Sequence, residues 1–253
     1  NTLAQKWLLE YCIKENKKDQ ILYWSERLAK KNEPEGQYAL GLCYLGNFGV
    51  ERKEEEAIKY LTKAGEAGVA YAQYELGRYY ENNKQIEDNW KKAVYWYQKA
   101  DKQNLPEATC ELAFYYSDEK YFISLIEKAA KQGYAKAQNI LGVCYCNGKR
   151  IVKDKTKAFY WFEQAAKQGY VDAQYNLASC YDDGIGVEKN EERASYWLEQ
   201  AAKQGHVEAQ TYLAVHYIEG IGVEKNEKKA FYWFEQAAKQ GQADAQAQLA
   251  ICY

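Results

Sequence analysis

The sequence predicts an all-α fold: an α-α solenoid of about seven helix-turn-helix repeats followed by one unpaired C-terminal helix. Three observations predict it. The chain repeats itself at a regular interval, both halves of each repeat carry apolar residues at helical spacing, and only 2 of the 253 residues are Pro. We therefore expect no β-strand, and a single repeat array over residues 1–253.

Each repeat opens with a small residue, and the later openings lie 36 residues apart. Two earlier repeats are shorter, with 32 residues between the first two openings and 29 between the fourth and fifth. A fixed period of this size is typical of stacked helical repeats. The openings are Ala4, Gly36, Ala72, Ala108, Ala137, Ala173, Ala209 and Ala245.

The first helix of each repeat is predicted from one apolar stripe. Counting from 0 at the opening residue, position 4 is always Leu, and from the second repeat onward position 8 is Tyr. Position 5 is Gly or Ala in the same copies, as in Gly77 and Ala178. Because a Gly inside a helix costs about 1 kcal/mol relative to Ala, we expect a second backbone to cross closely at position 5.

The second helix alternates small and bulky residues, which lets neighbouring helices interdigitate. Ala stands at position 21, Trp or Tyr at position 24 and Ala at position 28, as in Ala194, Trp197 and Ala201. We expect the position 24 aromatics to lie in the packed interior. Gly205 and its equivalents follow the last apolar turn, where a left-handed helix stop is favoured.

These residues resemble the Sel-one-like repeat family (SLR), a branch of the tetratricopeptide superfamily. The shared pattern is A-Q-x-x-L-G-x-x-Y-x-x-G-x-G-V, then K-A-x-x-W and A-A-x-x-G, and it covers essentially the whole chain. The resemblance implies a right-handed superhelix whose first helices line a concave groove. The repeat from Ala72 lacks the G-x-G-V loop and the repeat from Ala108 is shortened at Ser117–Lys120, so we expect the curvature to change there.

Partner-binding candidates follow from that groove. Positions 2, 6 and 9 are implied to face it, and they differ between copies while positions 0, 4, 5 and 8 hardly change. Variable positions are free to recognise a partner, and Tyr and Arg are common anchors of binding hot spots. We expect the centre of binding on the four repeats that open between Gly36 and Ala137. The candidates are Tyr38, Leu42, Tyr74, Arg78, Glu81, Phe114, Asn139, Val143, Tyr175, Ser179, Asp182 and Thr211.

Catalytic and metal chemistry are not expected. Cys144, Cys180, His216 and Cys252 share position 7, but residues on successive repeats lie too far apart to converge on one tetrahedral zinc. Acid pairs such as Asp182-Asp183 are more typical of helix ends than of glycosidase sites. With only 2 His in the chain, no Ser-His-Asp triad is expected. We predict no catalytic residue, no metal and no cofactor.

Composition narrows the partners and the compartment. The 34 basic and 36 acidic residues are scattered, so no basic stripe predicts nucleic-acid binding, and no apolar run predicts a membrane span. An odd number of cysteines, 7, favours free thiols and a cytoplasmic location. An extracytoplasmic location stays open if an N-terminal signal has been removed. The unpaired last helix suggests a fragment of a longer protein.

The sequence therefore predicts a protein–protein interaction scaffold or adaptor that binds another protein or peptide, in an oligomeric state left open. The resemblance implies adaptors, bacterial proteins that act on host cells, regulators and immunity proteins. One alternative is a regulatory or immunity-type module within a larger protein. A β-lactam-binding or β-lactam-hydrolysing enzyme, as described for cysteine-rich relatives, fits less well because their paired cysteines are replaced, for instance by Ala166 and Gln174.

Overall fold

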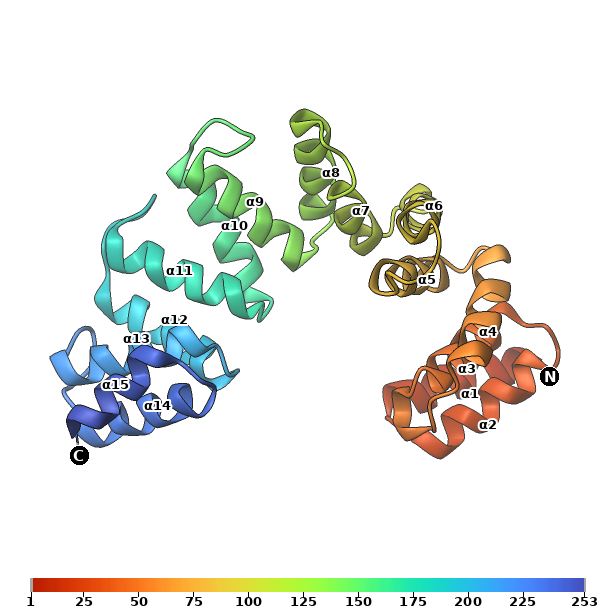
Figure 1. Ribbon diagram of the computed structural model, residues 1–253, viewed down its shortest axis with the longest axis horizontal. Coiled ribbons are helices and arrows are strands. Elements are labelled where there is room, and N and C mark those ends of the chain that lie inside the picture. The colour runs from red at the N-terminus through yellow and green to blue at the C-terminus, as the bar shows by residue number, and fades with distance from the viewer. Residues whose placement is uncertain (1, 253) are drawn as a thin grey trace. The chain divides into compact units, whose positions relative to one another are not determined.

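A computed structural model describes residues 2–252, and within them it contains fifteen α-helices, one short 3-10 helix and no β-strand (Figure 1). The prediction of an all-α repeat fold is confirmed. The helices are α1 (Thr2–Lys14), α2 (Lys18–Ala29), α3 (Pro34–Tyr44), η1 (Asn47–Gly49), α4 (Glu54–Glu66), α5 (Ala70–Asn82), α6 (Asn89–Lys102), α7 (Pro106–Ala113), α8 (Glu119–Lys131), α9 (Ala135–Asn147), α10 (Lys155–Lys167), α11 (Val171–Asp183), α12 (Glu191–Lys203), α13 (Val207–Glu219), α14 (Glu227–Lys239) and α15 (Ala243–Cys252).

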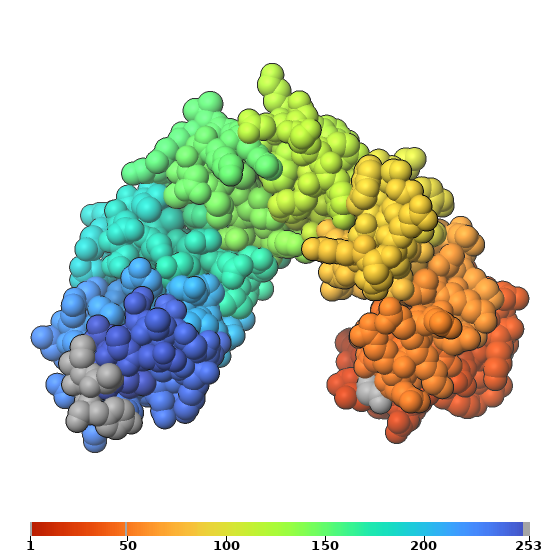
Figure 2. All heavy atoms as spheres, viewed as in Figure 1, coloured from red at the N-terminus to blue at the C-terminus, as the bar shows by residue number. Residues whose placement is uncertain are grey.

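The helices form two compact units, one ending at Ser117 and the other beginning at Asp118. The division falls in the turn of the shortened repeat. Within each unit a helix packs mainly on its neighbours in the chain, as expected of stacked helix pairs. Odd-numbered helices are the first helices of their repeats and even-numbered helices are the second. Side chains fill the spaces between successive ribbons of a unit (Figure 2).

Helix starts and loops follow local sequence. Second helices of unit 2 begin at Asp or Asn, and the Asn190 side chain accepts a hydrogen bond from the Arg193 backbone N–H at 2.9 Å. The second glycine of the G-x-G-V loop, Gly186, has a φ of +72°, and a Cβ there would clash with the Lys155 carbonyl of the preceding repeat. This loop therefore needs glycine both for its left-handed backbone and for its close approach to α10.

The interior corrects two details of the sequence analysis. The expectation for position 24 holds for Trp96 and Trp233, which are 7–9% exposed, but Trp161 and Trp197 are only half-buried. The most deeply packed bulky residue is at position 25, where Tyr97, Phe162 and Phe234 are 0–3% exposed. Position 5 is small because that side chain lies on it, since a Cβ at Gly142 would meet the Phe162 ring at 2.7 Å. The crowding comes from a side chain and not, as expected, from a crossing backbone.

A glutamine network joins consecutive repeats and explains the Gln at position 1 of every repeat except the one from Ala108, which has Thr109. Gln138 on α9 is 6% exposed and donates to the Ala130 carbonyl at the end of α8. It also accepts a hydrogen bond from Gln168, beyond α10, at 2.8 Å. Buried amides need such partners, and each one ties together three helices. The arrangement recurs at Gln73 with Gln103, Gln174 with Gln204, and Gln210 with Gln240.

Candidate partner-binding surface

Pockets open between successive first helices at equivalent places in the two units. The unit 1 pocket lies between α3 and α5 and has a volume of about 310 Å³. The unit 2 pocket lies between α9 and α11 and measures about 170 Å³. Each pocket lies between the C-terminal end of one first helix and the middle of the next first helix. The first is lined by Leu45, Asn47, Arg52, Glu75, Arg78, Tyr79, Asn82 and Asn83, and the second by Val143, Cys146, Asn147, Phe162, Asn176, Ser179, Cys180 and Ile185.

The unit 1 pocket is polar and holds one predicted anchor, Arg78. Its guanidinium lies 3.3 Å from both carboxylate oxygens of Glu75 and 5.8 Å from the centre of the Tyr74 ring. The Arg78 side chain remains 50% exposed, so some of its guanidinium N–H groups face solvent. This pocket offers a cation on an aromatic platform, with amide groups around it.

Tyr38 and Tyr74, also predicted anchors, lie beside that pocket. Burial, followed by the charge of Glu75, raises the pKa of Tyr38 to about 12. Burial and the charge of Glu111 raise the pKa of Tyr74 to about 12, although Arg78 opposes this. Both phenols are thus neutral hydrogen-bonding groups with half-buried rings, which suits them to a protein interface.

Glu81, a predicted groove residue, is held inside unit 1. Its two carboxylate oxygens accept hydrogen bonds from the hydroxyls of Tyr97 at 2.9 Å and Tyr115 at 3.0 Å. Burial first, and then Glu81, raise the pKa of both tyrosines far above the ordinary value. Glu81, on α5, therefore connects this helix to α6 and to the segment that directly follows α7. At this copy of position 9, the side chain is matched to its packing partners and does not face a groove.

Three predicted residues of unit 2 have similar structural partners. Asn139 is 8% exposed and accepts a hydrogen bond from the Asn176 side chain at 2.9 Å. The Thr211 hydroxyl donates to the Val207 carbonyl one turn earlier, at 3.2 Å. Asp182 lies 3.5 Å from Nε2 of His216. We expected these side chains to face a groove, but they connect or brace first helices.

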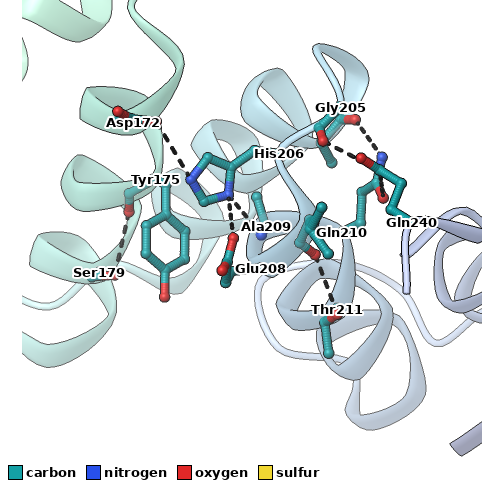
Figure 3. Close-up of polar contacts among 12 residues, drawn as sticks. Asp172, Tyr175, Ser179, Gly205, His206, Glu208, Ala209, Gln210, Thr211 and Gln240 are labelled. Atoms are coloured by element: carbon teal, nitrogen blue, oxygen red, sulfur yellow. Dashed lines mark hydrogen bonds and ion pairs between the residues drawn. The ribbon is translucent and has the colours of Figure 1, made fainter. Parts of the chain in front are cut away.

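The remaining candidates differ in exposure. Val143 and Ser179 line the unit 2 pocket, and Phe114, at the end of α7, is 55% exposed. Leu42 is half-buried on α3. Tyr175 stacks on His206, with ring centres 4.7 Å apart and planes at 21° (Figure 3). The structure thus brings Arg78 into one pocket and Val143 with Ser179 into another, and it does not gather all twelve candidates at one site.

His206 has a second role that its sequence position did not reveal. It precedes α13, and its Nδ1 accepts a hydrogen bond from the Ala209 backbone N–H at 3.2 Å, so it caps the helix (Figure 3). Glu208 lies 3.4 Å from the same nitrogen and Asp172 lies 3.8 Å from the other. An N-cap function for histidine is hard to foresee, because Ser, Thr, Asp and Asn are the usual caps.

Ser195, His216 and Asp182 meet in unit 2, although no Ser-His-Asp grouping was expected. The Ser195 hydroxyl lies 2.7 Å from His216 Nδ1, and Asp182 lies near the opposite ring nitrogen. Ser195 is 2% exposed and donates to the Ile221 carbonyl at 2.7 Å. A nucleophile must reach its substrate with a base ready to take its proton. This serine is enclosed and its proton is already engaged, so the group links α11, α12 and α13.

The position 7 residues do not converge. Cys43, Cys144 and Cys180 are buried free thiols on separate helices, while the Cys252 side chain lies outside the described residues. Burial raises the pKa of Cys180 to about 12. Among the described residues, no group of three or more His, Cys, Asp and Glu side chains could hold a metal ion. No helix in the described part of the chain is long and apolar enough to span a bilayer.

Helix pairs, the G-x-G-V loop and the glutamine network together define an SLR-type repeat protein. The Sel1 repeat family model matches residues 34–69, 70–104, 135–170, 171–206 and 207–242, which make up more than half of the chain. The chain belongs to the Sel1 repeat family. The matches leave out the first repeat and the shortened one, which depart furthest from the pattern.

Solved structures share this fold. A Sel1 repeat protein from Oxalobacter formigenes is 30% identical, with 92% of this chain and 96% of that chain covered, at a TM-score of 0.78. A protective antigen present in uropathogenic Escherichia coli strains is 31% identical at a TM-score of 0.77; the match covers 90% of this chain and 50% of that one. An immunity protein from Pseudomonas aeruginosa, 21% identical with 81% and 80% covered at a TM-score of 0.61, is similar in fold alone. Comparison with curated protein sequences gives no match.

Proposed function

We propose that the chain is a non-catalytic interaction module that binds a partner protein or peptide on the first-helix side of its repeats. The observation that carries the proposal is the pocket between α3 and α5, where Arg78 stands on an aromatic platform and keeps half of its side chain exposed. Arginine and tyrosine at a pocket are the usual anchors of protein interfaces.

The internal chemistry supports binding over catalysis. The best candidate for a nucleophile, Ser195, is enclosed and donates its proton to a backbone carbonyl. The buried thiol of Cys180 has a raised pKa, which disfavours the reactive thiolate. The buried side chains of Gln138, Asn139 and Ser195 are hydrogen-bonded to groups on other helices, and the open pockets lie at positions that differ between repeats.

The test is to purify the partner with this chain as bait and to measure its affinity for two alanine variants. Arg78→Ala or Tyr74→Ala should weaken binding by about 1–2 kcal/mol or more, with little loss of stability. The matched control is Arg27→Ala on the second helix α2, where Arg27 similarly lies over Tyr23, 5.4 Å from its ring centre. Arg27→Ala should leave affinity unchanged. Partner protection confined to second helices would contradict the proposal.

A further inference from the structure

Three of the four first helices of unit 1, namely α3, α5 and α7, carry an excess of negative charge. Helices α3, α5 and α7 contain five Glu and a single Arg, a net charge of −4, and no Lys. The second helices of the same unit are different, because α4 and α6 together contain five acidic and six basic residues. The first-helix side formed by α3, α5 and α7 is thus acidic, whereas α4 and α6 together are close to neutral.

Aromatic rings alternate with these carboxylates from helix to helix. Tyr38 on α3 lies within the electrostatic reach of Glu75 and Tyr71 on α5. Partial burial, followed by the charge of Glu107 on α7, raises the pKa of Tyr71, which is 48% exposed. We call this surface the acidic aromatic face; it consists of Tyr38, Tyr71, Tyr74, Glu75, Glu107 and Glu111.

One carboxylate on this face lacks a hydrogen-bond partner. Oε2 of Glu107, in the first turn of α7, is buried and is the one such side-chain atom among the described residues. An unpaired buried carboxylate oxygen is unfavourable, and a cation held beside this carboxyl group would offset its charge. The only cation on these three helices, Arg78, is directed to Glu75 instead.

We propose that the acidic aromatic face binds a lysine- or arginine-rich segment of a partner protein. Cationic side chains are attracted to aromatic faces within about 6 Å and form strong hydrogen bonds with carboxylates. The charge of the face selects cations and repels acidic segments. This inference rests on the proposed function, since it names the chemistry of the partner that the first-helix side of unit 1 would bind.

The experiment uses the whole chain and two fluorescent peptides of equal length, one rich in Lys and one rich in Glu. Fluorescence anisotropy should show binding of the Lys-rich peptide that weakens as salt is added. The double variant Glu107→Gln, Glu111→Gln should weaken it about tenfold. Tyr71→Ala should also weaken it, and Tyr71→Phe should not, because the ring is retained.

The matched control changes the same amount of charge on unit 2. Asp172→Asn with Glu208→Gln alters first helices α11 and α13 and should change affinity by less than about twofold. An equal loss in the control, or equal binding of the Glu-rich peptide, would overturn the inference. Thermal unfolding followed by circular dichroism checks that each variant is folded.

Amide hydrogen exchange separates this inference from the proposed function. Protection by the Lys-rich peptide on α3, α5 and α7 supports both. A purified partner that protects those helices but binds equally well to the Glu107 and Glu111 variant would reject the cationic segment and keep the binding module. Protection of α4 and α6 by both the peptide and the partner would reject both proposals.

Discussion

Units 1 and 2 place different chemistry at the same point of the repeat. In unit 1, Glu81 at position 9 of one first helix holds Tyr115 at position 7 of the next repeat. In unit 2, Asp182 and His216 occupy the equivalent positions and lie 3.5 Å apart. In each pair an acidic residue at position 9 contacts a matching residue at position 7 of the next repeat. Replacing one member of a pair with the corresponding residue of the other pair would disturb that match. Variation between copies therefore also reflects which residues pack together, and variability alone does not identify a partner-binding residue.

The two units also differ in the variable residues that line their pockets. Arg78 in unit 1 and Val143 and Ser179 in unit 2 are variable residues that open onto a pocket. The unit 1 pocket is rich in charged and amide groups, whereas the unit 2 pocket includes two thiols and several apolar side chains. If binding is concentrated in one unit, electrostatic recognition favours unit 1.

The largest expected effect tests whether the position 25 residue of a second helix, and not an exposed ring elsewhere on such a helix, builds the core. Tyr97→Ala removes a fully buried ring and leaves a Glu81 oxygen without its donor, so it should lower the free energy of unfolding by about 3–5 kcal/mol. Tyr196→Ala, on the equivalent second helix of unit 2, removes a ring that is 53% exposed and should cost less than about 1 kcal/mol.

Urea denaturation of the two variants measures both losses. Trp197→Ala, beside Tyr196, should fall between them because Trp197 is half-buried. If Trp197→Ala proves more damaging than Leu198→Ala, position 24 and not position 25 would dominate the core of unit 2. That result would contradict the assignment of position 25 as the main core position in both units.

The next effect concerns alkaline pH and unit 1. Tyr38 and Tyr74 have folded-state pKa values of about 12 against an ordinary value of 10.0. A raised folded pKa means that their contribution to stability is fully present below pH 10. It is then lost as the pH rises from about 10 to about 12, because the unfolded chain releases these protons first. Unit 1 should therefore be weakened in this range.

The double variant Tyr38→Phe, Tyr74→Phe removes both ionisable hydroxyls. Between pH 8 and alkaline pH, the free energy of unfolding of this variant should fall by less than that of the parent chain. The control is Tyr196→Phe with Tyr232→Phe, which changes two half-exposed tyrosines of unit 2. Circular dichroism against pH is the measurement. A control that gains as much alkaline resistance as the unit 1 variant would contradict the assignment.

Much of the fold could be predicted from the sequence because the repeat supplies its own internal comparison. Leu at position 4, Tyr at position 8 and the closing glycines set the helix pairs. The bulky position of the second helix was assigned one residue too early, since Trp161 and Phe162 are adjacent and equally apolar. Only the packing geometry shows that Phe162 lies on Gly142 while Trp161 stays half-buried.

The candidate site was harder to predict, for a physical reason. A helical position that varies between copies is either facing solvent or matched to a variable neighbour, and one sequence cannot separate the two cases. Arg78 proved to be of the first kind and Glu81 of the second. The Gln at position 1, present in every repeat but the one with Thr109, carried a usable signal, because a buried polar residue repeated at one position indicates a hydrogen-bond network.

The smallest expected effect concerns a local difference between helix starts in the two units. In unit 1, the first helices α5 and α7 follow Val69 and Leu105, which make no side-chain cap. In unit 2, α9 and α11 follow Tyr134 and Tyr170 without a side-chain cap as well, but α13 follows His206, whose Nδ1 accepts the Ala209 N–H. His206→Ala should lower the free energy of unfolding by about 1 kcal/mol, the usual contribution of an N-cap. It also removes the ring that stacks on Tyr175.

His206→Asn separates these two contributions, because asparagine keeps a capping oxygen but does not replace the stacked ring. If capping dominates, urea denaturation should show His206→Asn close to the parent chain and clearly more stable than His206→Ala. If both variants lose the same amount, the stacking on Tyr175 carries the effect. The first turn of α13 would then be stabilised by packing alone, like that of α5 in unit 1. The two units would differ only in their paired polar side chains and in the residues that line their pockets.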